Sequence, residues 1–224
     1  MDKHKVAIIL PVCNVMPHIK PMIEALYEST KFPFKLIIVD GFSTDGTEEY
    51  CQALANADVM VDRNIEFHQI ERKGLPNAIN YGIEKAGKLD VYLTQADVIH
   101  FKLFGRDWLQ DMYDTAKHNK NAGLIIGIGG GGISGPSFLD NFRWAGTWNT
   151  YIPRSAINKI GLFDEQFTNG DDIDYSYRVY LAGLDFLSIK YWVQHHELTN
   201  RRATHKPSNL INMGKLFKKK YNIK

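Results

Sequence analysis

Six aspartates stand at positions where a carboxylate could act on a bound ligand. They fall in the segments IIVDGFSTDGT, VYLTQAD and NGDDIDYSYR, and are Asp40, Asp45, Asp97, Asp171, Asp172 and Asp174. A positioned carboxylate can take a proton from an attacking hydroxyl, and carboxylate oxygens also bind hard divalent cations. Asp40 and Asp97 each follow an apolar run typical of a buried strand, and open α/β sheets collect ligand-binding residues at such strand ends. The sequence therefore predicts that aspartates able to act as a base or to bind a cation lie at the carboxyl edge of a sheet.

The elements that must hold these residues alternate between strands and helices. Continuous apolar runs predict strands, and apolar residues at helical spacing predict helices. The expected strands cover residues 6–12, 34–39, 59–61, 90–94, 124–128 and 186–193. The expected helices cover residues 17–29, a stretch from the capping hydroxyls of Ser43 and Thr44 through Ala55, residues 76–85, residues 107–118, and a helix that begins at Asp171. This order predicts an α/β domain with a mostly parallel central sheet and helices on both faces.

Length, composition and charge narrow the class of protein. The 224 residues, of which 44% are hydrophobic, are enough for one sizeable core, so we expect a single domain. The formal net charge is only +2, and no stripe of lysine or arginine alternates with aromatic residues. We therefore expect no nucleic-acid partner.

The spacing of the two cysteines and the length of the apolar runs indicate the cellular compartment of the protein. Cys13 and Cys51 lie far apart and form no C-x-x-C pair, so a disulfide scaffold or a zinc site is not expected. The first residues lead straight into a short apolar strand, without the features of a signal peptide. No apolar run approaches the ~20 residues that span a bilayer. The expectation is a soluble, cytoplasmic domain.

A glycine-rich stretch at residues 127–138 contains six glycines. It cannot bury a core rich in side chains, so it is expected to be a loop or a close backbone approach to a ligand. It lacks the Lys-Ser/Thr ending of a P-loop and does not follow the first strand. A phosphate cradle stays open as the alternative to a loop that forms the rim of an acceptor site.

Five features, in this order and at this spacing, carry a resemblance to a known family. They are VAIILPVCN, LIIVDGFSTDGT, KGLPNAINYGIEKA, GLFDEQFTNGDDIDYSYRVYLAG, and His195 after the last strand. Together they resemble the inverting glycosyltransferases of the GT-A fold, over nearly the whole chain. The resemblance implies a Rossmann-like GT-A domain over residues 1–205, followed by a basic C-terminal segment at residues 206–224. It also implies a nucleoside-diphosphate sugar as partner and, in most members, a divalent metal as cofactor.

The resemblance implies that Asp172 is the catalytic base, because the second acid of such a pair takes the acceptor proton. Asp171 would then orient the base, and Asp174 would help to cap the helix. From the residues alone, a second interpretation stays open. Three acids at a helix N-terminus also complement the helix dipole, at ~0.3 to 1 kcal/mol each.

Asp97 is the metal ligand that the resemblance implies, and His195 stands where the family often has a metal-binding histidine. The family usually shows Asp-x-Asp at this strand end, whereas this chain reads Gln95-Ala96-Asp97. Oxygen atoms from Asp97, the diphosphate and water suit a hard cation, and an imidazole favours Mn²⁺ over Mg²⁺. Only one of His195 and His196 is expected to reach the site, because neighbouring side chains of an extended segment point in opposite directions.

The family places an Asp at the end of its second strand to hydrogen-bond the base or ribose of the nucleotide, and Asp40 matches it. The alternative is that Asp40 caps its own turn. The other residues that match the nucleotide pocket are Pro11, Cys13, Asn14, Gly74, Asn80 and Ala96. Two departures concern the choice of base: Cys13 replaces a common tyrosine, and Gly41-Phe42 replaces a common acid-Gly pair. UDP is favoured, with dTDP and GDP open.

Trp148 and Asn149 are the candidate acceptor-binding residues, since an aromatic face beside a polar group suits a sugar ring. The alternative is that these are core residues beneath the glycine-rich stretch. The lysine-rich C-terminal segment could form a basic amphipathic helix on anionic lipid, near a lipid-linked acceptor at the inner membrane face. A solvated tail is the alternative.

Together with these observations, the resemblance implies metal-assisted transfer of a sugar from a nucleoside diphosphate to the hydroxyl of a glycan or lipid-linked acceptor, with inversion. Two alternatives remain. One is a non-catalytic relative that binds nucleotide sugars or acts as a scaffold. The other is a sugar nucleotidyltransferase, which would be expected to open with a glycine-rich phosphate loop that VAIILPVCNVMP lacks.

Overall fold

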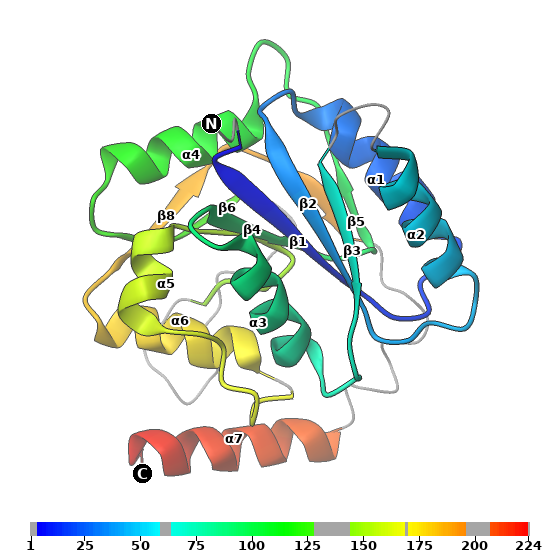
Figure 1. Ribbon diagram of the computed structural model, residues 1–224. Helices are drawn as coiled ribbons and strands as arrows, with labels where there is room; N and C mark the ends of the chain where they lie inside the picture. Colours follow the sequence, from blue (N-terminus) through cyan, green and yellow to red (C-terminus); the bar gives the residue numbers. More distant parts are fainter. Residues whose placement is uncertain (1–3, 59–63, 128–143, 169, 196–206, 224) are drawn as a thin grey trace.

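The structure, a computed structural model, describes residues 4–58, 64–127, 144–168, 170–195 and 207–223 (Figure 1). The strands are β1 (Val6–Val12), β2 (Phe34–Asp40), β3 (Ile65–Gln69), β4 (Asp90–Thr94), β5 (Val98–His100), β6 (Ala122–Gly127), β7 (Asn149–Ile152), β8 (Asp185–Ile189) and β9 (Val193–His195). The helices are α1 (Ile19–Ser29), α2 (Thr47–Asp58), α3 (Leu75–Ala86), α4 (Trp108–His118), α5 (Arg154–Ile160), α6 (Asp171–Leu181) and α7 (Pro207–Tyr221).

One mostly parallel sheet forms the centre of the described structure. Its order is β3-β2-β1-β4-β7-β6-β8, and β7 alone runs antiparallel to its neighbours within this sheet. A short antiparallel ribbon of β5 and β9 stands beside it. The expected α/β architecture is therefore confirmed.

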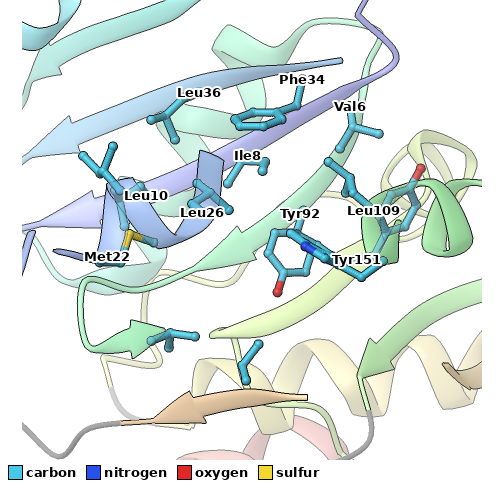
Figure 2. Close-up of a cluster of buried hydrophobic side chains, with 14 of the residues drawn as sticks. Val6, Ile8, Leu10, Met22, Leu26, Phe34, Leu36, Tyr92, Leu109 and Tyr151 are labelled. Atoms are coloured by element: carbon cyan, nitrogen blue, oxygen red, sulfur yellow. The ribbon is translucent and has the colours of Figure 1, made fainter. Parts of the chain in front are cut away.

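Helices cover both faces of the sheet because side chains along a strand alternate between its faces. Along β1, Ile8 and Leu10 belong to the core beneath α1 and α4, part of which Figure 2 shows. Ala7 and Ile9 point the other way, into the core beneath α3, α5 and α6. The continuous apolar run of β1 is thus the sequence signature of a strand buried on both faces.

The strand directions bring the candidate residues to one edge. The parallel strands β1, β2, β4 and β6 all end there, and β7 starts there, because Asn149 pairs with Thr94. The ribbon extends the same region, since His195 of β9 lies opposite Val98, the residue after Asp97. The opposite edge, where β8 starts at the exposed Asp185, is far along the strands from these residues.

Two expectations about elements need correction. The expected strand at 186–193 is two strands in different sheets, because the chain turns at Tyr191, whose backbone N–H donates to Ile189 O (2.9 Å). Helix α2 starts at Thr47 and its first turn is capped by Asp45, whose Oδ1 accepts from Thr47 N (3.1 Å). The expected strand at 59–61 lies outside the described residues, as does most of the glycine-rich stretch.

Three strands were not expected, namely β3, β5 and β7. β3 follows the expected position of the third strand, and β7 begins at Asn149, one of the two candidate acceptor-binding residues. Among the helices within the described ranges, none is both long and apolar enough to cross a membrane.

Candidate active site

Two turns at the carboxyl edge of the sheet are joined by hydrogen bonds. We call them the paired turns: residues 11–16, which include the end of β1 and the turn that follows it, and residues 41–47 after β2. Backbone amides of the first turn donate to side chains of the second, and these bonds are Asn14 N to Ser43 Oγ (2.9 Å), Val15 N to Thr47 Oγ1 (3.0 Å) and Met16 N to Asp45 Oδ2 (2.9 Å). In return, Thr44 N donates to Asn14 Oδ1 (2.8 Å). The paired turns therefore form one hydrogen-bonded unit beside the ends of β1 and β2.

Asp40 lies against the paired turns, and none of its surface is exposed. Its carboxylate accepts from Ser43 N (3.0 Å), from the Ser43 hydroxyl and from Gln69 Nε2 (3.2 Å). The structure therefore gives Asp40 the turn-holding contacts that the sequence offered as its alternative role. Contact with a nucleotide stays a prediction.

Cys13 and Arg72 meet across Gly41. A β-carbon placed on Gly41 would lie 3.5 Å from Cys13 Cβ and 3.7 Å from Arg72 Cβ, so the glycine lets both side chains close over the turn. Burial raises the pKa of the Cys13 thiol, which keeps it neutral. Arg72 is exposed and was missed by the sequence reasoning, although its place just after β3 in ERKG was a signal. Its guanidinium is a candidate contact for a nucleotide.

The KGLPNAINYG segment connects the region of the paired turns to the turn before α6. Gly74 precedes α3 with a positive φ of 119°, and Thr168 Cγ2 lies 3.6 Å from where its β-carbon would stand. The Asn80 amide donates to Phe163 O (2.9 Å), and Phe163 N donates to Asn80 Oδ1 (2.8 Å). Asn80 thus anchors the GLFDE turn, and its predicted nucleotide contact stays untested. Pro11 lies within β1, and Ala96 is buried in the turn after β4.

The candidate metal residues come together in the backbone. Asp97 stands in the turn between β4 and β5 and is 3% exposed. β9 brings His195 opposite Val98, although the His195 side chain and all of His196 lie outside the described residues. Over the part of the chain that the structure describes, no three His, Cys, Asp or Glu side chains gather closely enough to hold a metal ion. Metal binding by Asp97 and His195 therefore stays a prediction.

A buried histidine ties these two segments together. One ring nitrogen of His100 lies 3.0 Å from Thr94 Oγ1, and the other lies 2.8 Å from the Tyr191 hydroxyl. Burial lowers the pKa of His100 to about 3, so the ring is neutral and can donate to one partner and accept from the other. Trp108 stacks on His100 at 5.1 Å and on Tyr191 at 4.6 Å. The contacts of His100 fix the ribbon against the end of β4. The sequence pattern did not predict them.

Asp172 stands in the first turn of α6, half-buried, and lines a cavity of ≈ 10 Å³ with Thr147, Thr150 and Tyr175. That volume is at the lower limit for one water molecule, so a sugar must lie outside it. Burial, followed by the charge of Asp172, raises the pKa of the neighbouring Asp171 well above its usual range. The Asp171 carboxyl, beside that of Asp172, therefore stays protonated to a higher pH than an ordinary aspartate does.

The segment that carries Trp148 joins α6 to the end of β4. Ala145 N donates to Ser176 Oγ of α6 (3.1 Å), and Gln95 Nε2 donates to Thr147 Oγ1 at 3.5 Å. Trp148 is half-buried and its indole covers Gly146, where a β-carbon would lie 2.3 Å from Trp148 Nε1. The segment is therefore in contact with the helix of Asp172 on one side and with the strand before Asp97 on the other.

Asn149 differs from Trp148 in its surroundings. It is 5% exposed and its Oδ1 accepts a hydrogen bond from the Tyr92 hydroxyl (2.7 Å) inside the sheet. A β-carbon on Gly127 would lie 2.7 Å from Asn149 Nδ2, so the neighbouring strand closes over it. Trp148 is the more accessible of the two residues predicted to bind an acceptor.

Comparison with known proteins identifies a matching family and a curated relative. The family described as Glycosyl transferase family 2 matches residues 7–182. Among curated proteins, the succinoglycan biosynthesis protein ExoA of Rhizobium meliloti (strain 1021) is 25% identical over 197 residues, which are 79% of this chain. The chain spans 58% of the length of that relative.

Solved structures share the fold. The mannosyltransferase PcManGT from Pyrobaculum calidifontis, in complex with GDP-Man and Mn²⁺, superposes with a TM-score of 0.70 at 19% identity, over 91% of this chain and 60% of that one. Residues 1–349 of S. aureus TarS, in complex with UDP-GlcNAc, give a TM-score of 0.65 at 18% identity, over 90% of this chain and 62% of that one. At these identities the likeness establishes the fold.

Proposed function

This chain belongs to glycosyl transferase family 2, and we propose on that basis that it transfers a sugar from a nucleoside diphosphate to an acceptor hydroxyl with inversion. One observation carries the proposal: the helix of Asp172, the Trp148 segment and the turn of Asp97 are in contact at one edge of the sheet. A base, an aromatic surface and a candidate cation ligand thus adjoin one another. The paired turns lie along the same edge, as a donor site requires.

Asp172 is proposed to act as the base. It accepts the hydroxyl proton as the acceptor oxygen bonds to the anomeric carbon, and the bond from that carbon to the diphosphate oxygen breaks. Because a sugar hydroxyl has a pKa far above neutral, the reaction needs a carboxylate within hydrogen-bonding reach as the new bond forms. The half-buried position of Asp172 at the start of α6 leaves it accessible from the carboxyl edge.

The nucleotide is proposed to lie on the paired turns, near Asn14, Cys13 and Arg72. UDP remains the favoured nucleotide, and GDP is an alternative, because the solved neighbours bind UDP-GlcNAc in one case and GDP-Man in the other. Cys13 offers little surface for stacking on a base, whereas the planar guanidinium of Arg72 can stack on a base or pair with a phosphate. The choice of base and sugar is therefore expected to depend on Arg72 as well as on the paired turns.

A divalent cation is proposed to bind together with the donor, held by Asp97 and His195. It would neutralise negative charge on the leaving diphosphate. Mn²⁺ is favoured over Mg²⁺ because a histidine ligand suits a transition metal, and one solved neighbour is a complex with Mn²⁺. Gln95 stands where the family usually has a second acid, so the cation is expected to bind weakly in the absence of the donor.

A non-catalytic relative that binds nucleotide sugars is the second candidate. It is favoured by Gln95, which stands where the family usually has an acid, and by Cys13, which replaces a common tyrosine. Such a protein would bind a donor without hydrolysing or transferring its sugar.

We predict that one nucleotide, with Mn²⁺ present, raises the thermal midpoint of the wild-type protein. The measurement is a thermal-shift screen of UDP, dTDP, GDP, CDP and their sugars with Mn²⁺, Mg²⁺ or EDTA. A ligand present at a hundredfold excess over its Kd stabilises the folded state by ~2.7 kcal/mol, which gives a clear shift. A shift that EDTA abolishes supports the donor and metal proposals. No shift with any nucleotide, from folded protein, contradicts the proposed function.

Contact with an anionic membrane is proposed for the outer face of α7, and with it a position at the inner membrane face near a lipid-linked acceptor. The apolar side chains Met213, Leu216, Phe217 and Tyr221 pack inward, whereas Lys215 and Lys218 are exposed. Adsorption is therefore expected to be electrostatic and sensitive to salt.

Replacing both Lys215 and Lys218 by glutamate should weaken binding to vesicles that contain phosphatidylglycerol. Each lysine near such a surface contributes ~1 kcal/mol, so reversing two charges should lower binding at least ~10-fold. Cosedimentation measures it, with pure phosphatidylcholine vesicles as the control. Equal binding of the variant and the wild type would exclude this face as the contact.

A further inference from the structure

Helix α7 seats its side chains against the beginning of α6. Gly170, the residue before α6, has a positive φ of 79°, and a β-carbon placed on it would lie 2.6 Å from Met213 Cγ. Met213 therefore rests directly on the backbone that leads into Asp171. In Figure 1, α7 runs below α6 at the bottom of the molecule.

An aromatic cluster continues this contact along the helix. Phe217 of α7 is fully buried and packs against Phe167, with ring centroids 6.3 Å apart, and against Tyr177 at 5.1 Å. Tyr221 meets the edge of Tyr177 at 4.6 Å. Trp144, which precedes the candidate acceptor residue Trp148, packs against the same cluster. The apolar face of α7 thus joins α6 to the acceptor segment.

A polar clamp completes the contact at Asp174, which has none of its surface exposed. Its Oδ1 accepts from Lys220 Nζ (2.6 Å) and from the Tyr221 hydroxyl (2.7 Å), both of α7. Its Oδ2 accepts from Arg178 Nε (3.0 Å). Lys220 Nζ also donates to Asp164 (2.8 Å), in the turn before α6. A buried carboxylate without partners is costly, and α7 supplies two of the three side chains that pair with Asp174 here.

We propose that α7 is a brace for the catalytic helix, with Lys220 as the positioning residue that holds the first turns of α6 and so places Asp172 for proton transfer. This inference rests on the proposed function, since it assumes that Asp172 is the base. Met213 lies on one side of the Asp171–Asp172 pair and Lys220 on the other, so the two contacts together fix the segment between them.

Lys220 has an electrostatic effect as well as a mechanical one. The charge of Asp174 is among the causes that raise the pKa of Asp171, after burial and the charge of Asp172, so it is felt in the first turn of α6. The charged and titratable groups around this turn are Asp171, Asp174, Tyr175 and Arg178 of α6, Arg154 of α5, Asp164 of the preceding turn, and Lys220 and Tyr221 of α7. Removing the Lys220 cation leaves more negative charge near Asp172, which raises its pKa.

The test compares Lys220→Met with Lys219→Met, which removes a charge from the exposed neighbouring position, and with Lys220→Arg, which keeps the charge. The Lys220 side chain is 28% exposed, and methionine retains most of its apolar stem. We expect Lys220→Met to lower kcat roughly 10- to 100-fold, the range for a misplaced catalytic group, with little change in the KM for the donor. The acid side of its pH profile should move to higher pH, and Lys220→Arg should restore most of the activity.

Amide hydrogen exchange gives a second readout that needs no turnover. Amides at the start of α6 should exchange faster in Lys220→Met than in Lys219→Met, while amides of β1 and β2 keep their protection. If Lys220→Met destabilises the whole domain, Tyr221→Phe removes one hydrogen bond to Asp174 and should show the same changes on a smaller scale.

The outcomes separate the two proposals. An active wild-type enzyme in which Lys220→Met matches Lys219→Met in kcat, pH profile and exchange overturns the brace and leaves the proposed function standing. A wild-type protein that transfers no sugar from any donor overturns the proposed function. In that case unchanged exchange at the start of α6 in Lys220→Met would also overturn the brace.

Discussion

Replacing Asp172 by asparagine should lower the rate of sugar transfer by at least ~10²-fold, the lower end of what a positioned general base contributes. Asparagine has the size of aspartate and can still accept the hydrogen bond that Ile173 N makes to Asp172 Oδ1 (2.8 Å). Its amide cannot take a proton from the acceptor. The loss should therefore appear in kcat, while the affinity for the nucleotide changes little.

The measurement is steady-state kinetics together with nucleotide titration of the same variant. Asp185→Asn is the matched control, because Asp185 is exposed at the start of β8 on the opposite edge of the sheet. It makes the same chemical change away from the proposed site. Wild-type turnover in Asp172→Asn would rule out this residue as the base.

Replacing Asp97 by asparagine should weaken metal-dependent donor binding at least ~10- to 100-fold, since losing even an outer partner of a metal ligand has an effect of that size. Asp97 is nearly buried in the turn that the ribbon of β5 and β9 holds in place. An amide oxygen is a weaker, neutral ligand, so the cation loses a negative charge at its side.

Calorimetric titration of the donor with Mn²⁺ and then with EDTA measures this effect. The variant in Mn²⁺ should bind the donor about as weakly as the wild type does in EDTA, and Asp185→Asn should behave as the wild type. If Asp97→Asn keeps the full metal dependence, the cation is held by other groups.

The sheet, and the edge at which the candidate carboxylates gather, could be predicted because they depend on local patterns. The apolar run of β1 and the Asp40 and Asp97 strand ends are visible in single segments of sequence. β7 escaped prediction because Asn149 and Thr150 are polar residues, and their burial depends on Tyr92 and on strands that are distant in sequence. Local periodicity carries no record of such partners.

The same limit applies within the site. The role of Asp174 depends on Lys220 and Tyr221, 46 and 47 positions away, and a lysine-rich terminal segment is equally compatible with a solvated tail. His100 is one of eight histidines, and its importance comes only from contacts with Thr94 and Tyr191. The sequence could name candidate carboxylates, whereas the groups that hold them in place became visible only in the structure.

The paired turns, which we propose as the nucleotide site, have a consequence for attempts to change donor preference. Because Asn14, Val15 and Met16 of one turn donate to Ser43, Thr47 and Asp45 of the other, a replacement in either turn disturbs the hydrogen bonds of both. A single loop transplanted from a homologue would lack its hydrogen-bond partners in the other turn. Recombination libraries built on this scaffold should therefore exchange residues 11–16 and 41–47 as one cassette.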